Sequence, residues 1–302
     1  MRFAVMLACF VAFSLTASAA ERDRSLLAGG LTRTYTLIAP DKIKTLLPLL
    51  IVYHGGGQTA KRARRTTRFD ERAIGENFVV VYPQGLDNNW NDGRVSTDLR
   101  QRASAEADDV EFTLQIIAAL EVEGIIDPAR VFLTGASNGG MMAMRAACEL
   151  GDRIAGIAPV VANLPVDWQC RAKRMPALFI HGTDDDYMPF VGGQVAATKT
   201  KRDLGTVLSV DDTIAAFKRI NACTSVKETK TVDTVGRDQT KAVITDYVCT
   251  NAPLKHIVIE GGGHTWPGAR ESIIGELLLG KTSQDIDATA EIWTFFKSLP
   301  AR

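Results

Sequence analysis

A serine stands among glycines near the middle of the chain, in the stretch Thr134-Gly-Ala-Ser137-Asn-Gly-Gly140. This stretch fits the pattern G-x-S-x-G and lies between a short apolar run and a helix-forming segment. A strand that turns sharply into a helix exposes the serine hydroxyl, and glycines two residues before and after it remove side chains that would collide. The pattern predicts that Ser137 is a nucleophile for acyl transfer. The alternative is a tight turn that contains an incidental serine.

A serine hydroxyl needs a base, and the order expected for this motif is serine, acid, histidine. His264 lies in the glycine-rich stretch 261–268, directly after an apolar run, and is predicted to be the general base and later the acid. His256 lies inside that run, which favours a packed position. The triad acid is expected where the preceding core strand ends, and residue types alone leave three candidates there: Asp184, Asp185 and Asp186. His181, which precedes them, is expected to be structural.

The oxyanion formed during acyl transfer needs backbone donors. One is expected from the N–H of Asn138, the residue after the nucleophile. The second is expected from the loop after an earlier apolar run, where His54 is followed by three glycines. Glycines let the backbone approach a substrate closely, so Gly56 or Gly57 is the predicted donor.

Two tryptophans are candidates for contact with the substrate. Trp90 and Trp266 could line a pocket for an aromatic or apolar ester. The alternatives are that Trp90 anchors its own loop and that Trp266 braces the loop of the predicted base.

The elements that must position these residues are short apolar runs separated by helical patterns. The runs cover residues 31–38, 47–53, 78–82, 131–134, 154–161, 177–180 and 256–259, and are typical of strands, most of them buried on both faces. Helices are predicted over 108–122, 138–150, 213–221 and 285–299. Alternation of strands and helices predicts a mostly parallel sheet flanked by helices, in one domain over residues 21–302. The polar stretch 227–241 is expected to be a surface hairpin or loop.

The composition is that of an ordinary globular protein. The chain has 302 residues, of which 46% are hydrophobic and 23% charged, and its formal net charge is zero. Proteins that bind nucleic acid usually carry a basic excess, so this balance argues against a nucleic-acid partner. No stretch after the N-terminus is apolar enough to predict a membrane span.

The N-terminus predicts export. Arg2, the apolar run that follows it and the small residues Ala17-Ser-Ala19 are typical of a signal peptide over residues 1–20. The protein is therefore expected to be secreted or periplasmic. Four cysteines follow the signal peptide, and in an oxidising compartment an even number suggests disulfides. Of the three possible pairings, the one that closes the shorter loops is predicted: Cys148–Cys170 and Cys223–Cys249.

The whole set of motifs resembles the secreted esterases of the α/β-hydrolase fold that include polyhydroxybutyrate depolymerase-like enzymes and feruloyl esterases. The matching stretches are 54–57, 82–85, 90–92, 108–110, 135–140, 181–183 with Pro189, and 262–268. The resemblance implies that Asp185 is the triad acid, although the adjacent Asp184 and Asp186 depart from the usual pattern. It also supports both cysteine pairs.

The function implied is hydrolysis of a carboxylic ester through an acyl-enzyme, with no metal or organic cofactor needed. The substrate would be a feruloylated or acetylated polysaccharide, a polyester or a smaller ester. The alternatives are a short-chain or acetyl esterase, a peptidase on the same scaffold, and a binding protein without catalysis.

Overall fold

The computed structural model describes residues 19–96, 106–168, 170, 172–196, 198–270 and 272–301. The predicted signal peptide lies outside these residues except for its last two positions. The strands are β1 (Ala19–Ala28), β2 (Leu31–Pro40), β3 (Leu47–Tyr53), β4 (Val79–Pro83), β5 (Ile126–Ala136), β6 (Gly156–Val160), β7 (Ala177–Gly182), β8 (Gly193–Gln194), β9 (Thr206–Val207), β10 (Cys223–Val232), β11 (Lys241–Cys249) and β12 (Leu254–Glu260).

Helices alternate with these strands along most of the chain. They are α1 (Ala60–Thr67), α2 (Phe69–Glu76), α4 (Asp109–Val122), α5 (Asn138–Leu150), α6 (Val210–Ile220), α7 (Ile273–Leu279) and α8 (Ala288–Ser298), with the short 3-10 helices η1 (Leu86–Asn88) and η2 (Gly151–Arg153). The four predicted helices correspond to α4, α5, α6 and α8.

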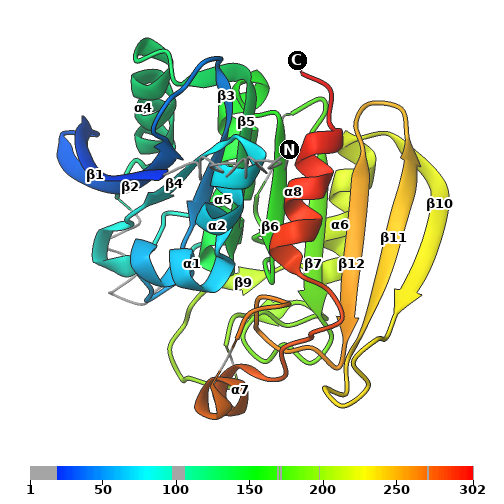
Figure 1. Ribbon diagram of the computed structural model, residues 1–302. Helices are drawn as coiled ribbons and strands as arrows, with labels where there is room; N and C mark the ends of the chain where they lie inside the picture. The colour runs from blue at the N-terminus through cyan, green and yellow to red at the C-terminus, as the bar shows by residue number, and fades with distance from the viewer. Residues whose placement is uncertain are drawn as a thin grey trace, which may run out of the picture.

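A ten-stranded sheet forms the centre of the protein, in the order β1-β2-β4-β3-β5-β6-β7-β12-β11-β10 (Figure 1). The strands from β4 to β12 in this order run parallel, whereas the strands at both ends pair antiparallel. Together with the flanking helices, this topology confirms the predicted α/β-hydrolase architecture. The carboxyl ends of β7 and β12 point downward in Figure 1, so the loops that follow them lie along the lower edge of the sheet.

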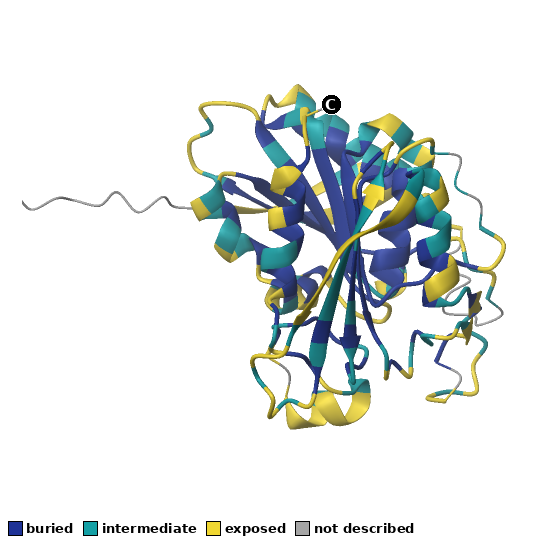
Figure 2. Cartoon of the chain, turned by 90° about the vertical axis from the view of Figure 1, so that its right-hand side faces the viewer, coloured by how far each residue is buried: buried dark blue, intermediate teal, exposed yellow. Residues whose placement is uncertain are grey.

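Helices cover both faces of the sheet, and each face has its own hydrophobic core. One core contains buried side chains of α4, α5 and α6, and the other contains those of α1, α2 and α8. Successive residues of β3 alternate between the cores: Leu49 and Ile51 pack in the first, and Leu50 and Val52 in the second. Because both faces are covered, the central strands are continuously apolar; in Figure 2 they form a buried centre between more exposed helices.

The polar stretch after α6 is part of a hairpin, as predicted, but the hairpin extends the main sheet. β10 is its outermost strand, and most of its residues are exposed (Figure 2). An edge strand has solvent on one side, so its residues need not be apolar, which is why hydrophobicity did not indicate it. Lys227 and Lys230 along this edge disfavour pairing with another chain. β1, at the opposite edge, was likewise not predicted.

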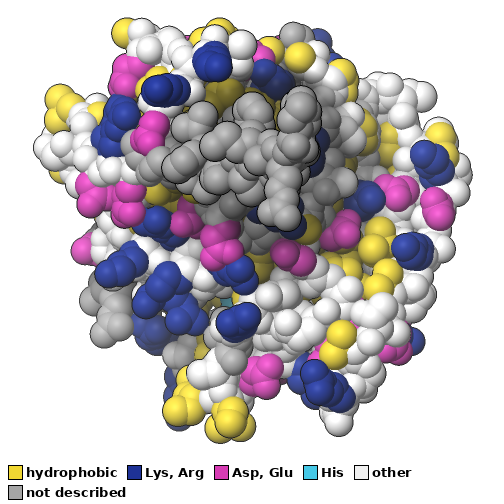
Figure 3. Space-filling model, viewed as in Figure 1, with side chains coloured by type: hydrophobic (Ala, Val, Ile, Leu, Met, Phe, Trp, Pro, Cys, Tyr) yellow, Lys and Arg dark blue, Asp and Glu magenta, His cyan; other side chains and the backbone are white. Residues whose placement is uncertain are grey.

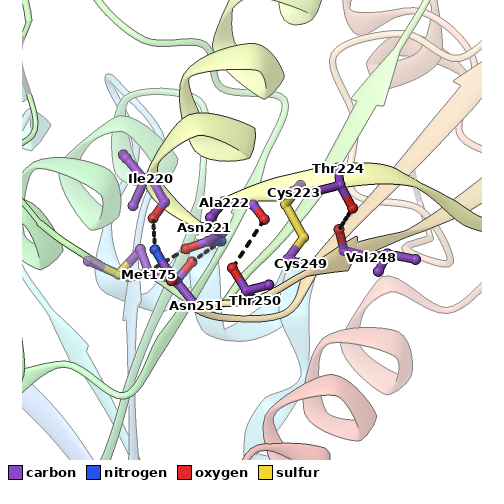
Figure 4. Close-up of a disulfide and its surroundings, with 10 residues drawn as sticks. All are labelled: Met175, Ile220, Asn221, Ala222, Cys223, Thr224, Val248, Cys249, Thr250 and Asn251. Carbon is purple, nitrogen blue, oxygen red and sulfur yellow. Dashed lines mark hydrogen bonds between the residues drawn. A yellow bond between two sulfur atoms is a disulfide. The ribbon is translucent and has the colours of Figure 1, made fainter.

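Both predicted disulfides are present. Cys223–Cys249 joins the start of β10 to the end of β11 (Figure 4). Beside it the side chain of Asn221 bonds in both directions with the backbone of Met175, which ties this end of the hairpin to the segment that leads into β7. Cys148–Cys170 fixes α5, the helix that follows the predicted nucleophile, to the segment after β6.

Candidate active site

Ser137 occupies a strained turn between β5 and α5. Its backbone angles are φ 57° and ψ −125°, a conformation that side-chain-bearing residues rarely adopt. A Cβ on Gly135 would lie 2.7 Å from the carbonyl carbon of Gly139, and one on Gly139 would lie 2.5 Å from the carbonyl oxygens of Tyr53 and His54. The two glycines therefore allow the turn to close on itself and against the end of β3, which leaves the serine at the carboxyl edge of the sheet.

The predicted base lies against one of the three aspartates. His264, after β12, donates from Nδ1 to Oδ2 of Asp185, after β7, over 2.7 Å. The other carboxylate oxygen of Asp185 accepts the N–H groups of Tyr187 and Met188, at 2.8 and 2.7 Å, and the side chain is 2% exposed. A buried carboxylate that holds Nδ1–H leaves Nε2 of the imidazole as the proton acceptor, which is the role that the acid has in a serine hydrolase triad.

The neighbouring aspartates face elsewhere. Asp184 accepts a hydrogen bond from the hydroxyl of Thr183, and Asp186, whose side chain is 59% exposed, pairs with Lys199. Of the three aspartates that residue type alone left equivalent, only Asp185 therefore contacts His264.

Backbone contacts fix the loop of His264. Its N–H donates to the carbonyl oxygen of Leu279 over 2.6 Å, and the N–H of Gly263 donates to that of Lys281 over 2.9 Å. A Cβ on Gly263 would lie 2.2 Å from the Leu279 oxygen, so only glycine allows this close approach. The ring of Tyr187 stacks on the imidazole, with 5.2 Å between ring centroids.

Ser137 and His264 line the same pocket, which has a volume of about 550 Å³. The pocket is also lined by the glycines of the loop after β3, by Asn138 and by Trp266. No hydrogen bond joins the serine hydroxyl to Nε2 of His264, and neither atom has a partner among the described residues. Catalytic hydrogen bonds are often long in free enzymes and tighten when substrate binds. The arrangement brings a serine hydroxyl, an imidazole oriented by a carboxylate, and backbone N–H groups to one opening.

The two glycines predicted to donate to the oxyanion differ in whether their backbone N–H group is already hydrogen-bonded. The N–H of Gly57 already donates to the carbonyl oxygen of Asn88 over 2.8 Å, whereas the N–H of Gly56 has no acceptor among the described residues. Both glycines line the pocket. Gly56 together with the N–H of Asn138, at the N-terminus of α5, is therefore the better candidate pair.

Sequence reasoning missed a buried network that holds Asn138. The Asn138 side chain accepts from the N–H of Trp90 at 2.9 Å, and donates to the carbonyl of Trp90 at 3.0 Å and to Asp92 at 2.6 Å. Asp92 in turn pairs with Arg94, and both side chains are under 5% exposed. Arg94 also donates to the carbonyl of Leu204. The only sequence signal for this network was the stretch Trp90-Asn-Asp92, already noted among the matching motifs.

The two tryptophans have different surroundings. Trp266 lines the pocket, while its indole N–H donates to Thr289 over 3.0 Å. Trp90 is 3% exposed and is not among the residues that line the pocket. Its indole N–H donates to the carbonyl of His54 over 2.9 Å, and its ring meets that of Tyr53 edge to face. This placement favours the anchoring role over substrate contact for Trp90.

Three further histidines are buried and structural. His54 donates from Nδ1 to the carbonyl of Gly55 and accepts the N–H of Gly85 at Nε2, so it is neutral, and burial lowers its pKa to about 4. His181 donates to the carbonyl of Ala162 and lies 3.1 Å from His256; burial lowers the pKa of His181 to about 4 and that of His256 well below its usual value. His181 and His256 are thus the packed groups that the sequence predicted.

Comparison with known proteins gives a consistent result. The sequence matches the phospholipase/carboxylesterase family over residues 40–215. It is 30% identical to NocK of Nocardia uniformis subsp. tsuyamanensis, which carries an esterase name, over 86% of this chain and 79% of NocK. Feruloyl esterase B of Piromyces equi is 28% identical over 59% of this chain and 33% of its own, so the chain spans about a third of that protein.

More distant similarities point the same way. Poly(3-hydroxyalkanoate) depolymerase C of Paucimonas lemoignei is 27% identical over 52% of this chain and 37% of its own. Among solved structures, the crystal structure of native sOPH superposes with a TM-score of 0.54 at 17% identity, over 86% of this chain and 84% of sOPH, which shows a shared fold.

Proposed function

Because this chain belongs to the phospholipase/carboxylesterase family of α/β-hydrolases and is an esterase of that superfamily, we propose that it is an exported enzyme that cleaves carboxylic esters with Ser137, His264 and Asp185. The observation that carries the proposal is the 2.7 Å bond from His264 to the buried Asp185, in a pocket that also contains Ser137.

The reaction follows from these positions. Ser137 Oγ attacks the ester carbonyl while Nε2 of His264 takes its proton, and Asp185 stabilises the imidazolium through Nδ1–H. The N–H groups of Asn138 and Gly56 hold the oxyanion. The imidazolium then protonates the leaving alcohol, which leaves an acyl-serine. Water, deprotonated by His264, attacks this acyl group, and the acid is released as Ser137 regains its proton.

We propose a substrate of the kind that the resemblance implies, a feruloyl ester or a polyester, with a small acetyl ester as the alternative. Two of the three named relatives carry esterase names and the third is named a poly(3-hydroxyalkanoate) depolymerase, which favours an ester over a peptide. Trp266 lines the pocket and is proposed to contact the acyl or alcohol group. Two disulfides support export, because such bonds persist in oxidising compartments. The mass of the mature chain from the culture medium or periplasm tests the predicted cleavage near residue 20.

Ser137→Ala tests the proposal directly. We expect kcat for p-nitrophenyl acetate to fall at least about 10³-fold without loss of folding, because the nucleophile is absent. Ser225→Ala, on the exposed strand β10, is the matched control and should leave kcat unchanged. A fluorophosphonate probe should label the wild-type protein at Ser137 and nowhere in the variant. Turnover retained by Ser137→Ala would refute the assignment.

A further inference from the structure

The short helix α7 exposes an apolar face that does not pack against the rest of the described protein. Ile273, Ile274, Leu277 and Leu278 are 88%, 70%, 81% and 55% exposed, and no residue of the helix is buried. Residues three and four positions apart are neighbours on a helix surface, so Leu277 adjoins Ile273 and Ile274, and Leu278 adjoins Ile274; the four side chains form a continuous patch. Figure 3 shows apolar side chains gathered at the lower end of the molecule, where α7 lies in Figure 1. Large exposed apolar patches usually mark an interaction site.

The patch adjoins the pocket described above. Leu279, the last residue of α7, lines the pocket with Ser137 and His264. The same residue accepts the N–H of His264, and Gly263 donates to Lys281 just beyond the helix. The helix is therefore held against the loop of the proposed base, and its last residue borders the pocket.

The chemistry of the patch selects among possible occupants. Its four side chains offer no hydrogen-bond donor or acceptor, and Glu276 is the only ionisable residue within the helix. A polysaccharide would lose water from its hydroxyl groups there without gaining partners, which is unfavourable. The two cations that flank the helix, Arg270 and Lys281, are matched in number by Glu271 and Glu276, so this segment has no net charge to attract a charged surface. An uncharged apolar surface instead gains from burial of all four side chains.

We propose that α7 docks the enzyme on the apolar surface of a water-insoluble ester, an aliphatic polyester, and brings an ester group of that surface to Ser137. This inference rests on the proposed esterase function. Soluble esters reach the pocket by diffusion and need no such contact, so α7 acts on insoluble substrate alone.

Adsorption without turnover tests the docking surface. In the Ser137→Ala background, Ile273, Ile274, Leu277 and Leu278 are all replaced by serine, and binding to suspended poly(3-hydroxybutyrate) particles is measured. The matched control carries serine at four aliphatic positions exposed elsewhere: Leu27, Leu31, Val122 and Val226. We expect the α7 variant to adsorb at least about tenfold more weakly and the control to adsorb as the parent does. With Ser137 present, both variants should hydrolyse p-nitrophenyl acetate within about twofold of wild type.

Several results would overturn the inference. Equal adsorption of the α7 variant and its parent is one, and an equal loss in the control is another. A wild-type dimer in light scattering that dissociates in the α7 variant would assign the face to a second copy. Binding to phosphatidylcholine vesicles but not to the polyester would assign it to lipid. Failure of the proposed function would be seen separately, as absence of p-nitrophenyl acetate turnover by the wild-type protein, since the adsorption experiment requires no catalysis.

Discussion

Replacing Asp92 with alanine removes the centre of the network that holds Asn138. Asp92 accepts from the side chain of Asn138 at 2.6 Å and from three nitrogens of Arg94 at 2.7 to 3.1 Å. Both members of the ion pair are under 5% exposed. Removing one partner of a buried pair leaves the other charge uncompensated and typically costs about 3–5 kcal/mol of stability. We expect the free energy of unfolding to fall by about that amount.

The same substitution should impair catalysis in a specific way. Asn138 keeps its bonds to the backbone of Trp90 but loses its bond to Asp92, so its N–H, the proposed oxyanion donor, is held less firmly. Complete loss of one oxyanion donor costs about 10²–10³-fold in kcat, and partial misplacement should cost about 10–100-fold. Because the oxyanion exists in the transition state and not in the bound ester, kcat should fall while KM changes little.

The assay pairs urea unfolding with steady-state hydrolysis of p-nitrophenyl acetate at a temperature where the variant is fully folded. Asp186→Ala is the control: its carboxylate is 59% exposed and pairs with Lys199 at the surface, so we expect a stability change of at most about 1 kcal/mol and unaltered kcat. If Asp92→Ala lowers stability but leaves kcat within about twofold of wild type, the network is structural only and the reasoning about Asn138 is refuted.

Three further predictions concern stability. Burial lowers the pKa of His54 and of His181 from 6.5 to about 4, so below pH 6.5 the unfolded chain binds more protons than the folded protein. The free energy of unfolding should therefore be highest above pH 6.5 and fall by up to about 3 kcal/mol for each histidine as the pH drops to 4. A urea midpoint that stays constant between pH 7 and pH 4 would contradict this. Replacing Cys223 and Cys249 by serine opens a loop with a sequence separation of 26, which should cost about 3.5 kcal/mol in urea unfolding; an unchanged midpoint would count against it. Gly139→Ala places a Cβ 2.5 Å from two backbone oxygens, so we expect a lower melting temperature and lost activity, whereas Gly236→Ala, in open surroundings, should match wild type.

Much of the architecture is encoded in local sequence patterns. Residues 47–53 form β3, as predicted, because a strand covered on both faces must be apolar at every position. The turn at Ser137 was recognisable because a non-glycine residue in that conformation needs glycines beside it, and Gly135 and Gly139 are spaced accordingly. The cysteine pairing also followed from spacing, since each pair closes a short loop. The outer strands β1 and β10 escaped prediction because edge positions do not require apolar residues.

Other features depend on contacts between segments far apart in the chain, and only the tertiary structure decided them. Which aspartate meets His264 depends on how the loops after β7 and β12 are placed side by side, and Asp185 differs from its neighbours in direction and not in type. Gly56 and Gly57 are chemically identical, and the carbonyl of Asn88 distinguishes them by occupying one N–H. Hydrophobic patterns in the sequence indicate the buried strands and helices, and motifs such as G-x-S-x-G indicate which residues are candidates for chemistry. Packing of the sheet and its loops determines which of those residues meet, because hydrogen bonds and burial depend on distances that no local pattern contains.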